Sequence, residues 1–516
     1  MLMNIYCAKC VGIQAVPVTV EVDISSGIGI HLVGLADVAV KESLLRIMTA
    51  LQSLGYRIPG RKIVINLAPA DVRKNGSGYD LPIALGILAA SGQCQLPGLD
   101  SYIIMGELGL DGSVKPVPGA ISIAEYAGEA GFAGCILPYE SADEASALRN
   151  VRIFGVHSVT DVLDMLSGSV PPEKFEMECS FGRAPESDSP GSQDFADVIG
   201  QEEAKRGLEI AVSGGHNVIM IGPPGSGKTS LARALPGIMP PLQEDEAIET
   251  GKIYSVAGLG GGGGIVTVRP FRSPHYSASM AAIIGGGNGD NILPGEVSLA
   301  HNGILFLDEF ALMPSRVAEA LRGPLEDRSV VISRLRSKVS FPSSFMLVAA
   351  ANPCPCGYYG VADRCICSPS QRQSYLSRLS GPIMDRIDIQ LYVNQISPSE
   401  LVGRKKAEKS AVIADRVKSV RDLQKDRYSG TGVSVNAEMT SSMIDRYCRL
   451  SGKSRETMER ISERMGFSAR AYTRILKTAR TIADMEFVST GGRSGIDIRT
   501  EHLAEAAGYR FLDRLV

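Results

Sequence analysis

Residues 217–230, NVIMIGPPGSGKTS, decide the fold of the central part of this chain. The apolar run VIMI is typical of a buried strand, and it leads directly into GPPGSGKT, which satisfies the phosphate-binding pattern GxxxxGKT. Glycines let the backbone wrap closely around phosphates, so that amide N–H groups and the start of the next helix face the negative charge. Lys228 is expected to reach the β- and γ-phosphates, and Thr229 to offer its hydroxyl to Mg²⁺. The predicted ATP-binding residues are Gly222, Pro223, Pro224, Gly225, Ser226, Gly227, Lys228, Thr229 and Ser230.

A second apolar run, GILFLDE at residues 303–309, ends in two carboxylates. Asp308 is predicted to hold the Mg²⁺ ion, and Glu309 to orient and deprotonate the attacking water. The alternative is an acidic pair on a surface turn. Two carboxylates directly after a buried apolar strand are unusual unless a ligand neutralises them, so the pattern favours ATP hydrolysis.

The pattern of apolar residues divides the chain of 516 residues into three parts. Between residues 16 and 168, strand-like stretches alternate with helical ones, which predicts a complete α/β domain. A stretch rich in Pro, Ser, Gly and acidic residues follows, and after it a second α/β segment gives way to helical periodicity. We therefore expect domains at 1–176, 194–395 and 396–516, with a linker at 177–193.

The composition indicates a globular, non-membrane protein. Hydrophobic residues make up 44% and charged residues 21%, and no apolar run reaches the roughly 18 residues that span a bilayer. The first residues do not have the layout of a secretory signal, which predicts a cytoplasmic location. A formal net charge of −3 argues against a surface that is basic all over, but it allows a local basic channel.

Several longer phrases are more specific than either nucleotide motif: VGLADVAVKESLLR, INLAPADVRKNGSGYDLPIA, RPFRSPHYSAS, PGEVSLAHNGILFLDE, NPCPCGYYG and SGPIMDRIDI. With them, nearly the whole chain resembles the YifB/ComM family of magnesium-chelatase-like AAA+ ATPases, in the helix-2-insert branch. The resemblance implies an α/β fold with a Lon-protease-like (S5-type) N-terminal domain, an AAA+ P-loop NTPase core and a C-terminal α-helical lid. It also implies a homo-oligomeric, hexameric ring that acts on DNA as a helicase and promotes branch migration during natural transformation.

Three further site residues follow from the AAA+ resemblance. Asn352 ends the strand-like run FMLVAAAN and matches the sensor 1 residue, whose amide contacts the γ-phosphate or the water; the alternative is an Asn that starts a turn before a proline. Arg386 precedes the run IDIQLYV, where AAA+ rings present an arginine finger to the neighbouring ATP site. Arg470 opens an amphipathic helix and matches the sensor 2 arginine, expected to contact the γ-phosphate across the cleft. Ordinary surface arginines are the alternative for both.

The N-terminal domain resembles the proteolytic domain of Lon protease, but its chemistry does not carry over. The phrase KNGSGYD at residues 74–80 corresponds to the turn that holds the Lon nucleophile, and the expected serine position falls on Gly78. The partner lysine would fall near Ile121, where no lysine stands, while Ser77 and Lys74 are the nearest substitutes. We therefore expect an inactive domain that serves assembly or partner binding.

Four cysteines lie close together in the chain, at Cys354, Cys356, Cys365 and Cys367. Four thiolates suffice for one tetrahedral Zn²⁺, and Gly357 and Gly360 allow the chain to turn between the two pairs. The CxC spacing is tighter than the usual CxxC knuckle. The sequence predicts structural zinc in the loop 354–367, with four reduced thiols as the alternative.

Local basic residues are the candidates for DNA contact. Arg334, Arg336 and Lys338 alternate along VVISRLRSKVSF, so a strand or hairpin would project them from one face towards a phosphate backbone. A solvated hairpin face is the alternative. The glycine-rich segment 285–295 is a second candidate pore element, and neither segment offers aromatic side chains for stacking. A competing hypothesis is a chelatase-type or chaperone-type ATPase that remodels a protein, for which an aromatic or hydrophobic pore loop would be the sign.

Overall fold

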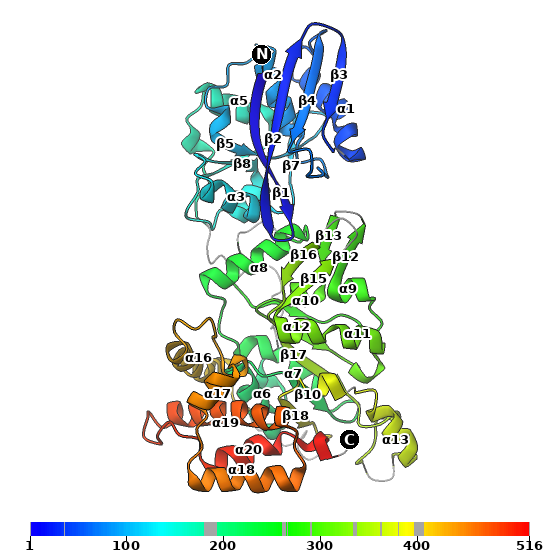
Figure 1. Cartoon of the computed structure of the whole chain (residues 1–516), viewed down its shortest axis with the longest axis vertical. Coiled ribbons are helices and arrows are strands. Elements are labelled where there is room, and N and C mark those ends of the chain that lie inside the picture. The colour runs from blue at the N-terminus through cyan, green and yellow to red at the C-terminus, as the bar shows by residue number, and fades with distance from the viewer. Residues whose placement is uncertain are drawn as a thin grey trace.

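The computed structural model describes residues 2–35, 37–179, 193–260, 265, 267–288, 291–333, 338–361, 364–379, 381–396 and 407–514. Figure 1 shows three layers stacked along the long axis of the chain: an N-terminal α/β unit, a central unit built on a parallel sheet, and a C-terminal group of helices. Most of the expected linker at 177–193, and the start of the expected C-terminal part, lie outside the described residues.

The N-terminal unit is built on a seven-stranded mixed sheet with the strand order β3-β4-β2-β1-β5-β8-β9. The long hairpin β1–β2 is antiparallel, and β2 pairs antiparallel with β4, whereas the remaining pairs are parallel. Strand β4 alternates buried and half-buried residues, the pattern of a strand with one face on the core. The strands are β1 (Leu2–Val11), β2 (Gln14–Ser25), β3 (Gly29–Val33), β4 (Lys62–Ala68), β5 (Tyr102–Ile104), β8 (Gly134–Pro138) and β9 (Ile153–Val156), with the small hairpin β6 (Glu107–Leu108) and β7 (Val114–Lys115) beside them.

Five helices accompany this sheet. Helix α2 is buried along almost its whole length, which explains why its sequence DLPIALGILAA is apolar all round. The helices are α1 (Val38–Ser53), α2 (Asp80–Ala90), α3 (Ala120–Glu129), α4 (Tyr139–Ala145) and α5 (Val159–Ser167).

The central unit is built on a five-stranded parallel sheet with the order β11-β14-β17-β10-β18. Strands β10, β14 and β17 are buried along their full length, as expected for parallel strands covered by helices on both faces. In β10, Val218 and Met220 join the apolar cluster shared with the C-terminal helices, while Ile219 and Ile221 join the cluster on the opposite face. The strands are β10 (Val218–Ile221), β11 (Phe271–Arg272), β14 (Ile304–Leu307), β17 (Met346–Ala351) and β18 (Ile389–Tyr392).

Two antiparallel hairpins rise from the central unit towards the N-terminal unit (Figure 1). They are β12 (Gly285–Asn288) with β13 (Asn291–Pro294), and β15 (Ser329–Ser333) with β16 (Lys338–Pro342). The central helices are α6 (Glu202–Gly214), α7 (Lys228–Ala234), α8 (Glu244–Val256), α9 (Met280–Ile284), α10 (Glu296–Leu299), α11 (Ser315–Ala320), α12 (Arg322–Asp327), α13 (Pro369–Leu376) and α14 (Gly381–Met384). Short 3-10 helices lie at Leu99–Ser101, Pro172–Lys174, Phe195–Asp197, Leu235–Ile238, Phe310–Leu312, Asn436–Glu438 and Phe511–Arg514.

Helix α8 joins the first two units. It packs against α3, Lys252 of α8 forms an ion pair of 2.5 Å with Glu125, and the N–H of Gly119 donates to the carbonyl of Ser255 at 3.1 Å. Leu242 and Ala247 are buried in the apolar core of the N-terminal unit rather than in that of their own unit. The two units therefore share part of one core.

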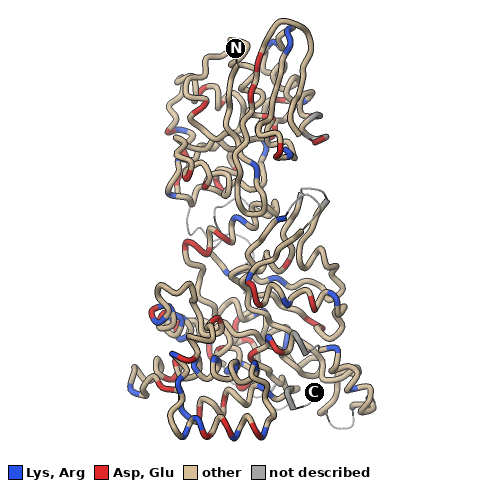
Figure 2. Tube along the Cα trace, in the orientation of Figure 1, with Lys and Arg blue, Asp and Glu red and all other residues tan. Residues whose placement is uncertain are grey.

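The C-terminal helices pack beneath the central sheet (Figure 1). They are α16 (Ser410–Arg427), α17 (Ser441–Tyr447), α18 (Gly452–Met465), α19 (Ala469–Ser489) and α20 (Thr500–Gly508). Lys, Arg, Asp and Glu are interspersed along the whole trace (Figure 2), in keeping with the small net charge. In the part of the chain that the structure describes, no helix combines the length and the apolar character needed to cross a membrane.

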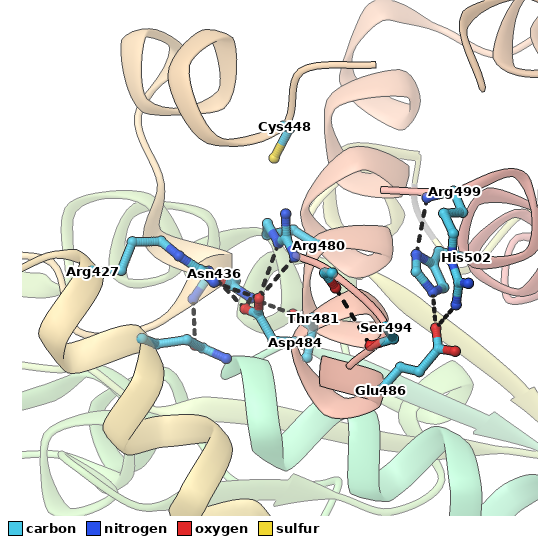
Figure 3. A network of polar contacts seen from close by, with 12 residues as sticks. Arg427, Asn436, Cys448, Arg480, Thr481, Asp484, Glu486, Ser494, Arg499 and His502 are labelled. Atoms are coloured by element: carbon cyan, nitrogen blue, oxygen red, sulfur yellow. Dashed lines mark hydrogen bonds and ion pairs between the residues drawn. The ribbon is translucent and has the colours of Figure 1, made fainter. Parts of the chain in front are cut away.

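A buried polar network holds these helices together (Figure 3). The carboxylate of Asp484 on α19 is fully buried, and it accepts hydrogen bonds from Arg427 of α16 at 2.5 and 2.7 Å. Arg480 donates to it at 3.1 Å and Asn436 at 2.9 Å. Two guanidinium groups around one buried carboxylate, with amide support, satisfy the condition under which a buried charge is tolerated.

The expected α/β fold with a parallel sheet and many helices is confirmed, and it is consistent with an AAA+ type domain. The structure also explains why the central strands are near-continuous apolar runs, because helices cover both faces of their sheet.

Candidate functional site

The predicted phosphate-binding loop connects β10 to α7. Gly225 and Gly227 have φ angles of 75° and 94°, in the left-handed region that favours glycine. A Cβ atom on Gly222 would lie 2.2 Å from the carbonyl oxygen of Val393, which is closer than any side chain allows. The loop therefore needs all three glycines, two for backbone conformation and one for close packing against the end of β18.

Lys228 is the first residue of α7, and its side chain points back into the loop. Its Nζ donates to the carbonyl of Gly222 at 2.7 Å and to that of Pro223 at 3.0 Å, and it lies 3.4 Å from Oδ1 of Asn352. Burial lowers the pKa of the Lys228 amine, since desolvation disfavours the charged form. A bound phosphate would supply the negative charge that this partly desolvated cation lacks.

The two carboxylates follow β14, the neighbour of β17. The hydroxyl of Thr229 donates to Oδ2 of Asp308 at 3.0 Å, so a hydroxyl and a carboxylate meet where a hard cation would find oxygen ligands. Glu309 comes next and its side chain is exposed. Its φ of 50° is a left-handed conformation that costs a non-glycine residue about 1–3 kcal/mol and that is found most often at functional sites.

Asn352 completes this arrangement from the strand between the other two. It follows β17, which pairs with β14 on one side and β10 on the other, so Asn352 lies between the phosphate loop and the two carboxylates. Parallel strands end at the same edge of a sheet, and ligands bind α/β sheets there. The structure thus brings Lys228, Thr229, Asp308 and Asn352 together, with Glu309 beside them. This set can bind a triphosphate with a divalent ion and accept a proton from water.

The two predicted arginines lie near the opposite ends of the strands, where β10 and β18 begin. Arg386 precedes β18, and the side chain of Asn217, just before β10, donates to the Arg386 carbonyl at 3.0 Å. The Arg386 side chain is 5% exposed and forms an ion pair with Glu326. Arg470 pairs with Asp385 at 3.0 Å. Both arginines lie beside the start of β10, whereas the phosphate loop follows the end of that strand. Because β10 has four residues and is therefore about 13 Å long, the arginines are separated from the loop by the length of the strand.

One contact at this edge was not predicted. Arg474 on α19 forms an ion pair with the buried carboxylate of Asp388, which also accepts from the backbone N–H of Asn217 at 3.0 Å. Nothing in the local sequence of 388 or 474 signals this pair, since 86 residues separate the two partners. It ties the C-terminal helices to the strand that leads into the phosphate loop.

The four cysteines come together in space. Sγ of Cys354 lies 3.3 Å from that of Cys356 and 3.8 Å from that of Cys365, and Cys356 and Cys365 are 3.7 Å apart. Together with Cys367, all four sulfur atoms lie within 4.8 Å of one another. Thiolates at about 2.3 Å from one tetrahedral Zn²⁺ would be roughly 3.8 Å apart, whereas a disulfide bond is only about 2 Å long. The residues present therefore fit a tetrahedral metal ion.

The N-terminal unit has no serine–lysine pair among its described residues at the expected place. The hydroxyl of Ser77 donates to Glu107, and the buried amine of Lys74 donates to the carbonyl of Pro69. A Cβ atom on Gly78 would lie 2.9 Å from Cε of Met105 and 3.2 Å from Cγ1 of Val117, so a serine there would require these side chains to shift. Ile121 is buried and packs against Gly251 of α8.

The hairpins carry the candidate DNA contacts. Lys338 begins β16 and is exposed, whereas Arg334 and Arg336 lie outside the described residues. A cleft of about 880 Å³, which sequence reasoning did not find, runs between the hairpins and the N-terminal unit. Its lining includes Lys9, Arg73, Glu107, Leu293 and Lys338.

Comparison with known proteins adds three findings. The family described as magnesium chelatase, subunit ChlI, matches residues 194–401, its C-terminal part matches 407–510, and subunit ChlI of Mg-chelatase matches 20–141. The chain is 42% identical to the uncharacterized protein YifB of Salmonella typhimurium and 40% identical to the competence protein ComM of Haemophilus influenzae, in each case over 100% of this chain and 98% of the relative. It is also 28% identical to the DNA replication licensing factor Mcm6 of Drosophila melanogaster over 210 residues, 38% of this chain and 22% of that protein.

Proposed function

The chain belongs to the YifB/ComM family of magnesium-chelatase-like proteins, and from that premise we propose that it is a ring-forming AAA+ ATPase that couples ATP hydrolysis to movement on DNA. Its role would be that of a helicase in branch migration during natural transformation, in the cytoplasm. The ATPase activity is supported by one observation: the side chains of Lys228, Thr229, Asp308 and Asn352 lie together at one edge of the parallel sheet. The name of the Mcm6 relative, a DNA replication licensing factor, supports the DNA part, and that of ComM, a competence protein, supports the link with transformation.

In the proposed function each of these residues has a part in hydrolysis. Lys228 and the loop N–H groups hold the phosphates, and Thr229 and Asp308 would hold Mg²⁺, which neutralises charge on the phosphates when bound. Glu309 accepts the proton of the attacking water, and the Asn352 amide orients that water or the γ-phosphate. Hydrolysis by a group this exposed requires that a closing surface excludes bulk water from the site.

A neighbouring copy of the chain supplies that surface in the proposed ring, a hexamer. Arg386 and Arg470 lie a strand length away from their own phosphate loop, so each serves the ATP site of the next subunit. Arg386 must then exchange its ion pair with Glu326 for the phosphate of the neighbour. The C-terminal helices act as the lid that carries Arg470, and Arg474 anchors this lid through Asp388.

In this proposal the hairpins β12–β13 and β15–β16 contact the DNA. Lys338, with Arg334 and Arg336 in the same connection, offers positive charge to a phosphate backbone without reading bases. The N-terminal unit, as a Lon-like domain without peptidase activity, stands over the hairpins and forms the other wall of their cleft. The four cysteines hold one structural zinc ion.

A second candidate function is the remodelling of a protein partner. Two apolar side chains on the hairpins, Leu293 and Val331, are 42% and 51% exposed, and an apolar pore element is what grips a polypeptide. The two functions share the same ATP site and differ in what the hairpins contact.

Branch migration on a synthetic four-way DNA junction tests the proposal. With ATP the wild-type protein should convert the junction into two duplexes, and Lys228→Ala should bind the junction but leave it intact because the phosphate loop no longer holds ATP. A junction left intact by the wild type under every ATP condition would refute the helicase role. ATP-dependent unfolding of a tagged protein substrate would support the second candidate instead.

A further inference from the structure

The loop that carries the four cysteines touches the phosphate loop directly. Gly357 has a φ of 86°, and a Cβ atom placed on it would lie 2.8 Å from both Cδ and Cγ of Pro224. The same position is 3.8 Å from Cγ of Asn352. The backbone at Gly357 is therefore in contact with the phosphate loop, and no side chain fits between them.

A second contact fixes the far side of the cysteine loop. The hydroxyl of Tyr392, the last residue of β18, donates to the carbonyl of Tyr359 at 3.2 Å, and Gly360 packs against the same hydroxyl. Val393, the next residue, is the one whose carbonyl lies against Gly222. The cysteine loop thus lies over the ends of β17 and β18, the two strands that flank β10 and its phosphate loop.

The four thiols bring the two ends of this loop together. The described residues between Asn352 and α13 form no regular helix or strand, and the backbone hydrogen bonds within them are short-range turns such as Gly357 N–H to the Cys354 carbonyl at 3.0 Å. Cys354 is buried and stands two residues after Asn352, so whatever holds its sulfur also holds the backbone that carries the Asn352 amide. A metal ion bound by four thiolates holds such a loop with folding free energy of its own.

We propose that zinc bound by the four cysteines is a positioning element of the ATP site, and that its occupancy sets the rate of ATP turnover. When they bind the ion, the four thiolates would hold Gly357 against Pro224 and fix the backbone of Asn352. Loss of the ion releases one wall of the phosphate loop. This inference rests on the proposed ATPase function for its kinetic part only, because the loop contact itself is independent of what the site hydrolyses.

One variant separates this positioning role from metal binding. Gly357→Ala keeps all four thiols but places a methyl group against the Pro224 ring in a left-handed backbone conformation. Gly432→Ala is the matched control, because Gly432 has a similar φ of 73° with nothing within 4 Å of the added Cβ. The two variants carry the same backbone penalty and differ in the contact.

The experiment uses the full chain loaded with zinc, stripped with a chelator, and reloaded with zinc alone. The readouts are zinc per chain, hydrogen exchange of the amides in residues 222–229, and kcat and KM for ATP. We expect stripped protein and zinc-loaded Gly357→Ala to exchange these amides faster and to lose kcat by about a hundredfold, as for a displacement of roughly 1 Å, with restoration on reloading for the wild type only. Gly432→Ala should match the wild type.

The inference would be overturned if both the stripped protein and Gly357→Ala showed wild-type amide exchange and wild-type ATP turnover. It would also be overturned if the protein took up no zinc when zinc was added. A zinc-loaded wild type without any ATP turnover would instead refute the proposed function. The exchange measurement would then decide the coupling between the two loops alone.

Discussion

Replacement of Glu309 by Gln isolates the chemical step from nucleotide binding. Glu309 follows β14 with an exposed side chain, whereas the groups placed to hold phosphate and metal are Lys228, Thr229 and Asp308. The amide of Gln has nearly the same shape but cannot accept the proton. A lost general base costs about 10²–10⁴-fold in rate, or about 3–5 kcal/mol of activation free energy. The folding free energy should change by less than about 0.5 kcal/mol, because the side chain is exposed.

The assay compares steady-state ATP turnover with equilibrium binding of a fluorescent ATP analogue. Glu309→Gln should bind the analogue with wild-type affinity and turn over at least about a hundredfold more slowly. Glu319→Gln on α11, another exposed carboxylate close by in the chain, serves as the control and should retain full turnover. Full turnover in Glu309→Gln, or loss of analogue binding, would refute the assignment of Glu309 as the base.

Two predictions concern stability. Asp484→Ala should lower the free energy of unfolding by about 3–5 kcal/mol, because Arg427 and Arg480 would keep buried charge without their carboxylate. Urea unfolding followed by circular dichroism measures this loss. A loss below about 1 kcal/mol would argue against the network. Burial raises the pKa of Glu144 from 4.5 to about 7, so between those pH values the folded state keeps a proton that the unfolded state releases, and stability falls as pH rises. Glu144→Gln should remove this fall, worth up to about 3 kcal/mol, in melting curves at pH 5 and pH 8.

Local signals made much of the candidate ATP site predictable. Each of the three strands that meet there is a short apolar run followed at once by the first residue of its motif: Gly222 of the phosphate loop, Asp308 or Asn352. Because the strands are parallel, such residues must gather at one edge, and no knowledge of distant contacts is needed. The four cysteines were predictable for a similar reason, since both pairs lie within 14 residues of chain.

The surroundings of the arginines were not predictable in this way. Position in the chain suggested Arg386, but its ion-pair partner is Glu326, 60 residues earlier. The place of Arg470 depends on how α19 packs, and one contact of that helix is the ion pair of Arg474 with the buried carboxylate of Asp388. Such pairs between distant segments leave no periodic or spacing signal, and neither does the packing of α8 against the N-terminal unit.

The proposed DNA motor is tested most directly by the ATPase rate with and without single-stranded and branched DNA at low salt, where backbone contacts are strongest. Two triple-alanine variants are compared with the wild type: the hairpin set Arg334, Arg336 and Lys338, and a control set of exposed arginines on α18, Arg455, Arg460 and Arg464. We expect DNA to raise the wild-type rate. The hairpin variant should lose this stimulation while keeping its basal rate, and the control variant should keep both. If the wild-type protein does not bind DNA and DNA leaves its ATPase rate unchanged, the proposed action on DNA is wrong. A protein substrate would then be the better hypothesis.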